Sequence, residues 1–456
     1  MDWMLSEVAN AVAGELIGTD LRVQGVSTDT RAIGAGQLFI ALAGERFDAH
    51  DFLAQAVASG AAALLVSRRE AVPVGVSAVC VADTRIALGQ LAAAWRARFA
   101  LPVIAVTGSN GKTTTKEMIA AILTAAFGDA VLATRGNLNN DIGLPLTLLG
   151  LHAGHRAAVI EMGMNHPGEI DYLTRIGQPT VALVNNAQRA HLEGMGELDE
   201  VAREKGSIFN GLPETGVAVI NADDAYAALW QTLAAGRTVR TFGIDQPADV
   251  RAKVRLHGLE TTLVISAPEG EGEVALAIPG RHNARNAVAA AAAGLAAGLP
   301  MDAVLAGLRA FAGVKGRLQR RAGRCGAEIL DDTYNANPDS VRAGIDVLAS
   351  TMGRKVLVLG DMGEIGDASA QYHDEIGGYA KSQGIDRLYA LGDVSKVAVR
   401  NFGEGARHFC NIDKLIAAVD KELGPETTVL VKGSRFMKME RVADALAAQP
   451  SAGEKH

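Results

Sequence analysis

Short apolar runs alternate with longer helical patterns along most of the chain. In the first hundred residues, apolar runs begin at Leu38, Ala62 and Ser77, and an Ala-rich stretch over 86–99 has helical spacing. Beyond Pro102, helical segments separate four further runs, which begin at Val103, Ala157, Thr180 and Gly216. Buried strands that alternate with helices of ten or more residues are typical of a parallel sheet covered by helices.

The pattern of apolar and polar positions changes twice in the second half of the chain. Period-two alternation over 249–279, around the turn-like APEGEGE, predicts an antiparallel flap or edge hairpin, and helical patterns follow over 283–299 and 301–311. From about Gly316 the strand-like runs EIL, KVLVLGD, RLYALGD and TVLVKGS alternate with helices. This predicts an α/β chain of three domains, over 1–101, 102–315 and 316–456, of which the last is Rossmann-like.

Composition excludes several classes of protein. Hydrophobic residues make up 48% and charged residues 21% of the 456 residues, which is ordinary globular usage, and the net charge of -7 disfavours nucleic-acid binding. The three cysteines form no C-x-x-C pattern, so a reducing, cytoplasmic location fits. The N-terminus has acidic residues where a signal peptide would be basic, and the apolar run over 287–299 stops at Pro300, so we expect no membrane span.

The strongest chemical signal follows the strand pattern that begins at Val103 and opens a helix. It consists of Thr107, Gly108, Ser109, Asn110, Gly111, Lys112, Thr113 and Thr114. Glycines there let backbone N–H groups face phosphate oxygens, Lys112 can reach the β and γ phosphates, and the Thr113 hydroxyl can bind Mg²⁺. The usual phosphate-loop pattern has glycine where Val106 stands, and a plain glycine-rich turn is the competing interpretation.

Two residues follow later strands of the same predicted sheet. Glu161 ends the strand from Ala157, at the edge where ligands collect in open α/β sheets, and His191 follows the next strand. A carboxylate and an imidazole there can hold Mg²⁺, although either could be an ordinary strand-end or loop residue. Lys205 lies in the helical VAREKGSIF, where spacing alone gives it no role.

A set of motifs that spans nearly the whole chain resembles the Mur ligase family. The motifs are STDTR from Ser27, LFIALAGERFDAHDF from Leu38, TGSNGKTTTKE, GNLNNDIGLP, VIEMGMNHPGEI, AHLEGMG, INADD, PGRHNARNAVAA, DDTYNANPDS from Asp331 and VLVKGSRFMKME. The phosphate loop with Val106 is itself the form found in this family. STDTR, the run from Leu38 and DDTYNANPDS match the branch that adds D-alanyl-D-alanine to UDP-N-acetylmuramoyl-tripeptide.

The resemblance implies a cytoplasmic, monomeric, ATP-dependent amide ligase of peptidoglycan synthesis that works through an acyl phosphate. It implies a UDP-sugar in the N-terminal domain, ATP in the central domain and the incoming dipeptide in the C-terminal domain. Two Mg²⁺ ions are expected, one held by Thr113 and one by Glu161 and His191, with Lys112 as a further catalytic residue. Lys205 matches the family's carbamylated lysine, which would bind the second ion.

Further roles are implied by the same motifs. Asn283 and Asn286 match positions near the adenine, Arg317 faces the phosphates, and Asp332 resembles the ribose contact. The implied substrate contacts are Ser27, Thr28, Asp29, Arg31, Asn137, Asn140, Tyr334, Asn335, Asn337, Lys432 and Ser434. Without the other motifs, NANP would be an ordinary turn and STDTR a helix cap or turn.

Four alternatives remain open at this point. A sister ligase that adds a single amino acid is the nearest, and DDTYNANPDS argues against it. A folylpolyglutamate synthase has its phosphate loop near the N-terminus, whereas about a hundred residues precede it here. A dinucleotide-binding oxidoreductase is disfavoured because Gly360, Gly363 and Gly366 do not fit G-x-G-x-x-G. A nucleotide switch would not need DDTYNANPDS, and the third residue of the tripeptide, diaminopimelate or lysine, stays open.

Overall fold

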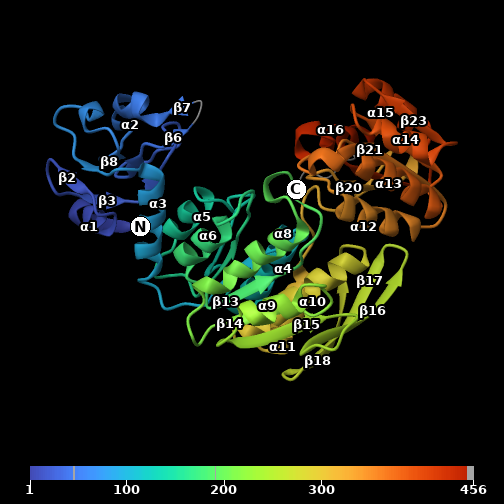
Figure 1. Cartoon of the computed structure of the whole chain (residues 1–456), viewed down its shortest axis with the longest axis horizontal. Coiled ribbons are helices and arrows are strands. Elements are labelled where there is room, and N and C mark those ends of the chain that lie inside the picture. Colours follow the sequence, from blue (N-terminus) through green and yellow to red (C-terminus); the bar gives the residue numbers. More distant parts are fainter. Residues whose placement is uncertain (45–46, 191, 449–456) are drawn as a thin grey trace, which may run out of the picture.

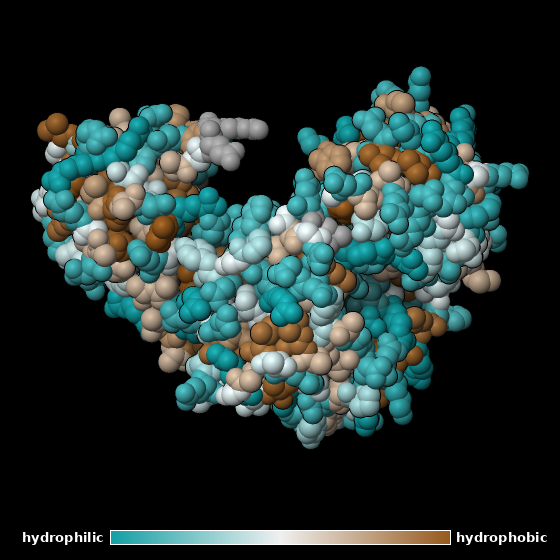
Figure 2. All heavy atoms as spheres, viewed as in Figure 1, coloured by the Kyte–Doolittle hydropathy of each residue, from teal (hydrophilic) through white to brown (hydrophobic). Residues whose placement is uncertain are grey.

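The computed structural model describes residues 1–44, 47–190 and 192–448. Figure 1 shows three α/β bodies that follow one another along the chain, with the first and the last raised on either side of the central one. Figure 2 shows a wide hollow between the two outer bodies. The predicted three-domain α/β architecture is confirmed.

The N-terminal domain is built on a five-stranded sheet in the order β2-β9-β8-β5-β4. The apolar runs of the sequence form its centre, as β5 (Leu38–Ile40), β8 (Ala63–Val66) and β9 (Ala78–Cys80). The remaining elements are β2 (Glu15–Ile17), β4 (Val26–Ser27), α1 (Leu5–Ala11), α2 (Leu53–Ala58) and α3 (Thr84–Arg96). Two small antiparallel pairs flank the sheet, β1 (Asp2–Met4) with β3 (Arg22–Gln24) and β6 (Ala43–Gly44) with β7 (Phe47–Asp48).

The central domain contains a nine-stranded sheet in the order β11-β12-β10-β13-β14-β15-β16-β17-β18. Its strands up to β16 pair in parallel, and β10, β12 and β13 are buried along their whole length. The parallel strands are β10 (Val103–Thr107), β11 (Val131–Ala133), β12 (Ala157–Glu161), β13 (Val181–Val184), β14 (Val217–Asn221), β15 (Thr238–Gly243) and β16 (Val250–His257). The expectation of a buried parallel sheet is therefore met.

Helices cover both faces of this sheet. They are α4 (Lys112–Phe127), α5 (Gly143–Leu149), α6 (Glu169–Gly177), α7 (Leu192–Met195), α8 (Leu198–Gly206), α9 (Ala227–Leu233), α10 (Arg281–Ala296) and α11 (Met301–Ala310). Successive residues of β10 enter opposite cores: Ile104 and Val106 pack with α4, α10 and α11, whereas Val103 and Ala105 pack on the side of α3, α5 and α6. Alternation of this kind follows from the period of two along a strand.

The predicted antiparallel segment extends the same sheet. β16 runs antiparallel to β17 (Glu260–Ala267), which in turn pairs with β18 (Gly270–Leu276). β16 also joins the parallel part, because Phe242 of β15 pairs with Val250. The segment is thus three strands at the edge of the main sheet rather than a separate flap (Figure 1).

The C-terminal domain has a six-stranded sheet in the order β19-β20-β24-β21-β22-β23. Its strands are β19 (Gln319–Ala322), β20 (Glu328–Asp332), β21 (Arg354–Gly360), β22 (Arg387–Leu391), β23 (Ala406–Phe409) and β24 (Thr427–Lys432), and its helices are α12 (Pro338–Ala349), α13 (Ser369–Ser382), α14 (Lys396–Phe402), α15 (Ile412–Asp420) and α16 (Glu440–Leu446). Only β19 runs antiparallel to its neighbour. Sequence patterns missed β19 and β23, which are edge strands without a single fully buried position.

Helix α3 attaches the N-terminal domain to the central one. The Trp95 indole donates a hydrogen bond to the Leu151 carbonyl at 3.0 Å, and the Arg96 guanidinium donates to the Gly177 carbonyl at 3.2 Å. One hydrophobic core continues from Trp3 of the first domain to Leu144 and Leu173 of the second. Among the described helices, none is long and apolar enough to cross a membrane.

Candidate active site

A polar cavity of about 880 Å³ lies where the central and C-terminal domains meet. The phosphate loop and the carboxyl end of β12 contribute one part of its wall, and the first turn of α10 contributes another. The C-terminal domain closes the opposite side with the segments around Arg317, Tyr334 and Lys432. Residues from motifs more than three hundred positions apart in the sequence therefore face one space.

The phosphate loop runs from the end of β10 to the start of α4, as predicted. Gly111 occupies the position before the helix with φ of 77°, in the left-handed region that favours glycine. A Cβ atom at Gly111 would lie 2.3 Å from Asn286 Oδ1 and 2.8 Å from Asn185 Nδ2. Both the backbone angle and the lack of space thus require glycine here.

Lys112 and Thr113 form the first turn of α4. Lys112 Nζ donates to the Gly108 carbonyl at 2.7 Å, so the ammonium lies over its own loop, and burial lowers the pKa of Lys112 against the opposing effect of the Glu161 carboxylate. The Thr113 hydroxyl accepts a hydrogen bond from Arg317 Nη2 at 2.9 Å. Arg317 also lies over the Tyr334 ring, with Cζ 4.2 Å from the ring centroid. Arg317 therefore reaches the phosphate loop, as the motifs implied.

A segment that sequence reasoning passed over holds the phosphate loop in place. Asn110 N donates to Asn186 Oδ1 at 2.8 Å, and the Asn110 carbonyl accepts from Asn185 Nδ2 and Asn186 Nδ2 at 2.9 Å each. Ser109 Oγ donates to the Gln188 carbonyl at 3.0 Å. The signal was present in the run NNAQ directly after β13, because polar side chains at a strand's carboxyl end are placed beside the neighbouring loop.

Glu161 lies at the carboxyl end of β12, beside β10, with 1% of its surface exposed. Its Oε1 accepts from Asn139 Nδ2 at 2.7 Å, while Oε2 is buried without a hydrogen-bond partner among the described residues. A buried carboxylate oxygen with no partner is costly unless a ligand pairs with it. Glu161 lines the same cavity as Thr113, so the donor set fits a Mg²⁺ ion, which takes one or two protein oxygens and completes its shell with phosphates and water.

The rest of the predicted metal set consists of His191 and Lys205. His191 lies outside the described residues. Among the residues that the structure does describe, no group of three or more His, Cys, Asp or Glu side chains could hold a metal ion. Lys205 is 1% exposed in α8 and is not among the described residues that line the cavity. Burial, and after it the charge of Lys112, lowers the pKa of Lys205, but the carbamate expected on Lys205 has no support.

The residues expected near the adenine lie in the first turn of α10. Asn286 Oδ1 accepts from Asn185 Nδ2 at 2.9 Å, and Asn286 Nδ2 donates to Asn283 Oδ1 at 3.2 Å. Asn283 Nδ2 in turn donates to the Pro279 carbonyl at 2.8 Å. The neighbouring His282 also lines the cavity, and burial lowers its pKa to about 4, which keeps the imidazole neutral at ordinary pH.

The C-terminal wall is organised by two adjacent strand ends. Asp332 of β20 is the register partner of Lys432 of β24, and Lys432 Nζ donates to Asp332 Oδ2 at 2.5 Å and to the Asn335 carbonyl at 3.0 Å. Ser434 Oγ donates to the Ala336 carbonyl at 3.1 Å. These contacts fix the loop between β20 and α12, so Tyr334, Asn335 and Asn337 line the cavity with Lys432 and Ser434.

Other implied substrate residues divide into two groups. Asn137 and Asn140 line the cavity, and Asn140 Oδ1 accepts from Gly143 N at 2.8 Å at the start of α5. Ser27, Thr28, Asp29 and Arg31 lie in the N-terminal domain and are not among the described lining residues. Hydrogen bonds from Arg31 lower the pKa of Asp29 to about 2. The structure therefore does not join the STDTR motif to the phosphate loop.

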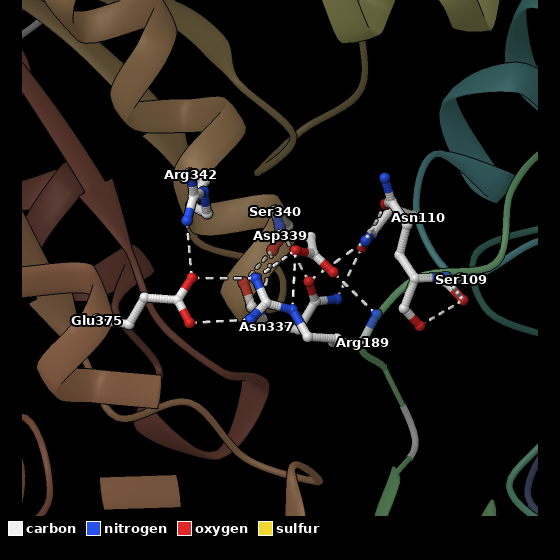
Figure 3. Close-up of polar contacts among 9 residues, drawn as sticks. Ser109, Asn110, Arg189, Asn337, Asp339, Ser340, Arg342 and Glu375 are labelled. Atoms are coloured by element: carbon white, nitrogen blue, oxygen red, sulfur yellow. Dashed lines mark hydrogen bonds and ion pairs between the residues drawn. The ribbon is translucent and has the colours of Figure 1, made fainter. Parts of the chain in front are cut away.

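Arg189 makes a bridge between domains that sequence reasoning missed. Its guanidinium contacts Asp339 of α12 and Glu375 of α13 (Figure 3). Close by, Asn337 Nδ2 donates to Asn110 Oδ1 at 2.7 Å and so ties the C-terminal domain to the phosphate loop. No periodic pattern marks such contacts, because each joins residues more than one hundred positions apart.

Comparison with known proteins agrees with the motifs. Family models match in chain order: the Mur ligase family catalytic domain over 22–96, the Mur ligase middle domain over 106–294, and the Mur ligase glutamate ligase domain over 316–435. The UDP-N-acetylmuramoyl-tripeptide--D-alanyl-D-alanine ligase of Escherichia coli (strain K12) is 45% identical over 448 residues, which is 97% of this chain and 98% of that relative.

Solved structures give the same result. A crystal structure of MurF from Acinetobacter baumannii has a TM-score of 0.92 at 38% identity and covers 98% of this chain and 99% of that one. MurF ligase from Thermotoga maritima in complex with ADP has a TM-score of 0.82 at 26% identity, over 93% of this chain and 97% of that one. With the phosphate loop, the C-terminal wall and these relatives in agreement, the chain belongs to the Mur ligase family.

Proposed function

We propose that this chain is an ATP-dependent ligase that joins D-alanyl-D-alanine to UDP-N-acetylmuramoyl-tripeptide. The products are UDP-N-acetylmuramoyl-pentapeptide, ADP and phosphate, in the synthesis of peptidoglycan precursors. The observation that carries the proposal is the single cavity, in which Lys112 of the phosphate loop faces Asn335, Asn337 and Lys432 of the C-terminal domain. The identity with relatives of that name supports the choice of substrates.

The first step activates a carboxylate. The terminal carboxylate of the tripeptide attacks the γ phosphorus of ATP, ADP leaves, and an acyl phosphate forms. Negative charge builds on the transferring oxygens, and Lys112 and Arg317 stand at the phosphate loop to stabilise it. For this, Lys112 must exchange its bond with the Gly108 carbonyl for phosphate oxygens, which is a rotation of one side chain.

Mg²⁺ fits the cavity as the metal of this reaction. When bound, it neutralises charge on the phosphates and on the attacking oxygen. Glu161 Oε2 would hold one ion and the Thr113 hydroxyl another, with His191 as a further ligand by resemblance. Arg317 would then have to release the Thr113 hydroxyl when nucleotide and metal bind.

The second step forms the amide bond. The neutral amine of D-alanyl-D-alanine attacks the carbonyl carbon of the acyl phosphate, and phosphate leaves from the tetrahedral intermediate. The buried ammonium of Lys432 and the side chains of Tyr334, Asn335 and Asn337 would bind the dipeptide beside the phosphate loop. Ser434, Asn137 and Asn140 would complete the polar wall. Asn283, Asn286 and Asp332 would receive the adenosine.

The N-terminal domain would bind the UDP-sugar through Ser27, Thr28, Asp29 and Arg31. We place the domain boundaries after residues 101 and 315. Backbone hydrogen bonds support them, because the Pro102 carbonyl accepts from Ala158 N at 2.9 Å within the central sheet and the Gly316 carbonyl accepts from Tyr334 N at 3.0 Å within the C-terminal domain. A UDP-sugar at STDTR would reach the phosphate loop across the hollow of Figure 2.

We place the enzyme in the cytoplasm as a monomer. ATP and UDP-sugars are cytoplasmic metabolites, and Cys80, Cys325 and Cys410 carry free thiols, as expected of a reducing compartment. One chain supplies both the phosphate loop and the opposite wall of the cavity, so the reaction needs no residue from a second copy.

The alternatives predict different substrates. A sister ligase would accept a single amino acid, and a folylpolyglutamate synthase would accept glutamate and need no UDP-sugar domain. The five-stranded sheet before the phosphate loop favours a UDP-sugar ligase. The deciding experiment measures ADP release with UDP-muramoyl dipeptide and tripeptide, each crossed against D-alanyl-D-alanine and single amino acids. Release that requires the tripeptide and the dipeptide together is expected, and equal turnover with single amino acids would overturn the assignment.

A further inference from the structure

We propose that Arg189 is a positioning residue. It docks the first turn of α12 onto the phosphate loop and so holds Asn337 in place in the C-terminal wall of the cavity, where the dipeptide would bind. The inference rests on the proposed function for the identity of the incoming dipeptide. The contacts themselves belong to the chain whatever its substrates are (Figure 3).

Arg189 binds the C-terminal domain with its backbone and its side chain. The Arg189 backbone N–H donates to Asp339 Oδ2 at 2.9 Å, and its Nε and Nη2 donate to Asp339 Oδ1 at 3.0 and 2.6 Å. Nη1 donates to Glu375 Oε2 at 2.9 Å, and Cζ lies 5.3 Å from the centre of the Tyr372 ring. One guanidinium thus joins the central domain to both α12 and α13.

The pairing is stronger than that of an ordinary surface ion pair. The side chains of Arg189, Asp339 and Glu375 are 26%, 22% and 31% exposed. The Asp339 carboxylate raises the pKa of Arg189, and Arg189 in turn lowers the pKa of Glu375. Several charge-assisted hydrogen bonds from one planar guanidinium fix the orientation of the two helices as well as their distance from Arg189.

The docked turn of α12 contains Asn337, two positions before Asp339. Asn337 Oδ1 accepts from Ser340 N at 2.9 Å and caps the helix, while Asn337 Nδ2 donates to Asn110 Oδ1 at 2.7 Å. Asn110 Nδ2 also donates to Gln188 Oε1 at 2.7 Å, directly before Arg189. The segment after β13 therefore holds the phosphate loop with Gln188 and α12 with Arg189, so that one strand end sets the distance between the nucleotide loop and Asn337.

The C-terminal domain does not need Arg189 in order to fold. Its own apolar residues form two cores on either side of its sheet, and neither includes a described residue of the segment after β13. Removal of the guanidinium should loosen the docking of the domain without unfolding it. The largest effect is expected on the dipeptide, because Arg317 has its own bond to Thr113 at the phosphate loop, whereas Asn337 reaches the loop through the turn that Arg189 docks.

The kinetic test uses the full chain with Arg189→Met, Asn337→Ala and the double variant. For Arg189→Met we expect the KM for D-alanyl-D-alanine to rise about tenfold or more, because small displacements of binding groups weaken productive binding strongly. The Kd for ADP should change less than twofold. Because both residues act through one turn, the double variant should be no worse than the poorer single variant. Arg175→Met is the matched control, since the exposed Arg175 side chain pairs with Asp171 within α6.

A second measurement does not depend on the substrates. Amide hydrogen exchange over residues 337–341 of the ADP-bound enzyme should be faster in Arg189→Met than in the wild type and unchanged in Arg175→Met. Unchanged exchange over residues 337–341 or an unchanged KM for the dipeptide would overturn the proposal. A double variant whose rise in KM equals the product of the two single rises would overturn it as well. A wild type that shows no turnover with these substrates while Arg189→Met speeds the exchange would refute the proposed function and leave the docking role standing.

Discussion

The Arg317 guanidinium donates a hydrogen bond to the Thr113 hydroxyl at 2.9 Å, although 204 positions separate the two residues. Arg317 lies at the start of the C-terminal domain, and Thr113 lies in the first turn of α4. The contact places a permanent cation beside the residue that would hold a metal ion. Movement of the C-terminal domain would therefore move positive charge into or out of the phosphate site.

Replacement of Arg317 should reduce turnover. In Arg317→Met the cation beside the phosphate loop is lost, and we expect kcat to fall by on the order of a hundredfold, as for other groups that stabilise developing charge. Arg317→Lys should recover part of the rate. Steady-state ADP release measures both. Arg320→Met, which removes the pair with Glu328 on the same stretch of chain, should stay near the wild-type rate. Equal losses at the two positions would contradict a specific role for Arg317.

Lys112→Ala should lower turnover by on the order of a hundredfold or more while the fold is kept. The Lys112 side chain makes its hydrogen bonds to the carbonyls of its own loop, so its loss removes charge without opening a core. Circular dichroism checks the fold, and Lys253→Ala, at an exposed position of β16, controls for the loss of a lysine. Near-normal ADP release by a folded Lys112→Ala enzyme would refute the phosphate-loop assignment.

Gly111→Ala should abolish nucleotide binding. A Cβ atom there would lie 2.3 Å from Asn286 Oδ1, so either the loop or the buried Asn286 side chain must move and break its hydrogen bond with Asn185. Gly168 precedes α6 with φ of 88°, in the same left-handed region, and has open space around it, so Gly168→Ala has comparable backbone strain without a collision. Calorimetric titration with ADP should show weak or no binding for the first variant and near wild-type binding for the second. Equally weak ADP binding by the two variants would mean that backbone strain alone explains the loss.

The stability of the C-terminal domain should fall on mild acidification because of His373. Its Nε2 accepts from Met362 N at 3.0 Å and its Nδ1 contacts the Ser369 carbonyl at 2.7 Å, which leaves no acceptor for a second proton. Burial lowers the pKa of His373 from 6.5 in the folded state. Below pH 6.5 the unfolded chain binds a proton that the folded chain does not, so stability is complete above this value and declines as pH falls towards the folded pKa.

Denaturant unfolding of the wild type and of His373→Gln at pH 7.5, 6.5 and 5.5 measures this effect. Below pH 6.5 the free energy of unfolding of the wild type should fall by up to about 1.4 kcal/mol more per pH unit than that of the variant. Parallel pH dependence in the two proteins would show that other groups cause the acid sensitivity.

Much of the fold could be predicted from local patterns. The phosphate loop and the strands from Val103 and Ala157 follow from apolar periodicity and glycine placement. The helices predicted over 283–299 and 301–311 form as Arg281–Ala296 and Met301–Ala310. Short polar edge strands such as β23 escaped prediction, because a strand with few buried positions has no apolar alternation. The expectation for Lys205 came from resemblance alone, and its carbamate gained no support.

The sequence by itself determined most of the elements and the motif residues that carry chemistry, because helix and strand patterns depend on neighbours within a few positions. The tertiary structure decided which of those residues meet. It brought Arg189 to Asp339 over 150 positions and Asn110 to Asn337 over 227, and it kept Asp29 apart from the phosphate loop. Such contacts depend on how whole domains pack against one another, and the packing of distant surfaces leaves no periodic trace in the chain.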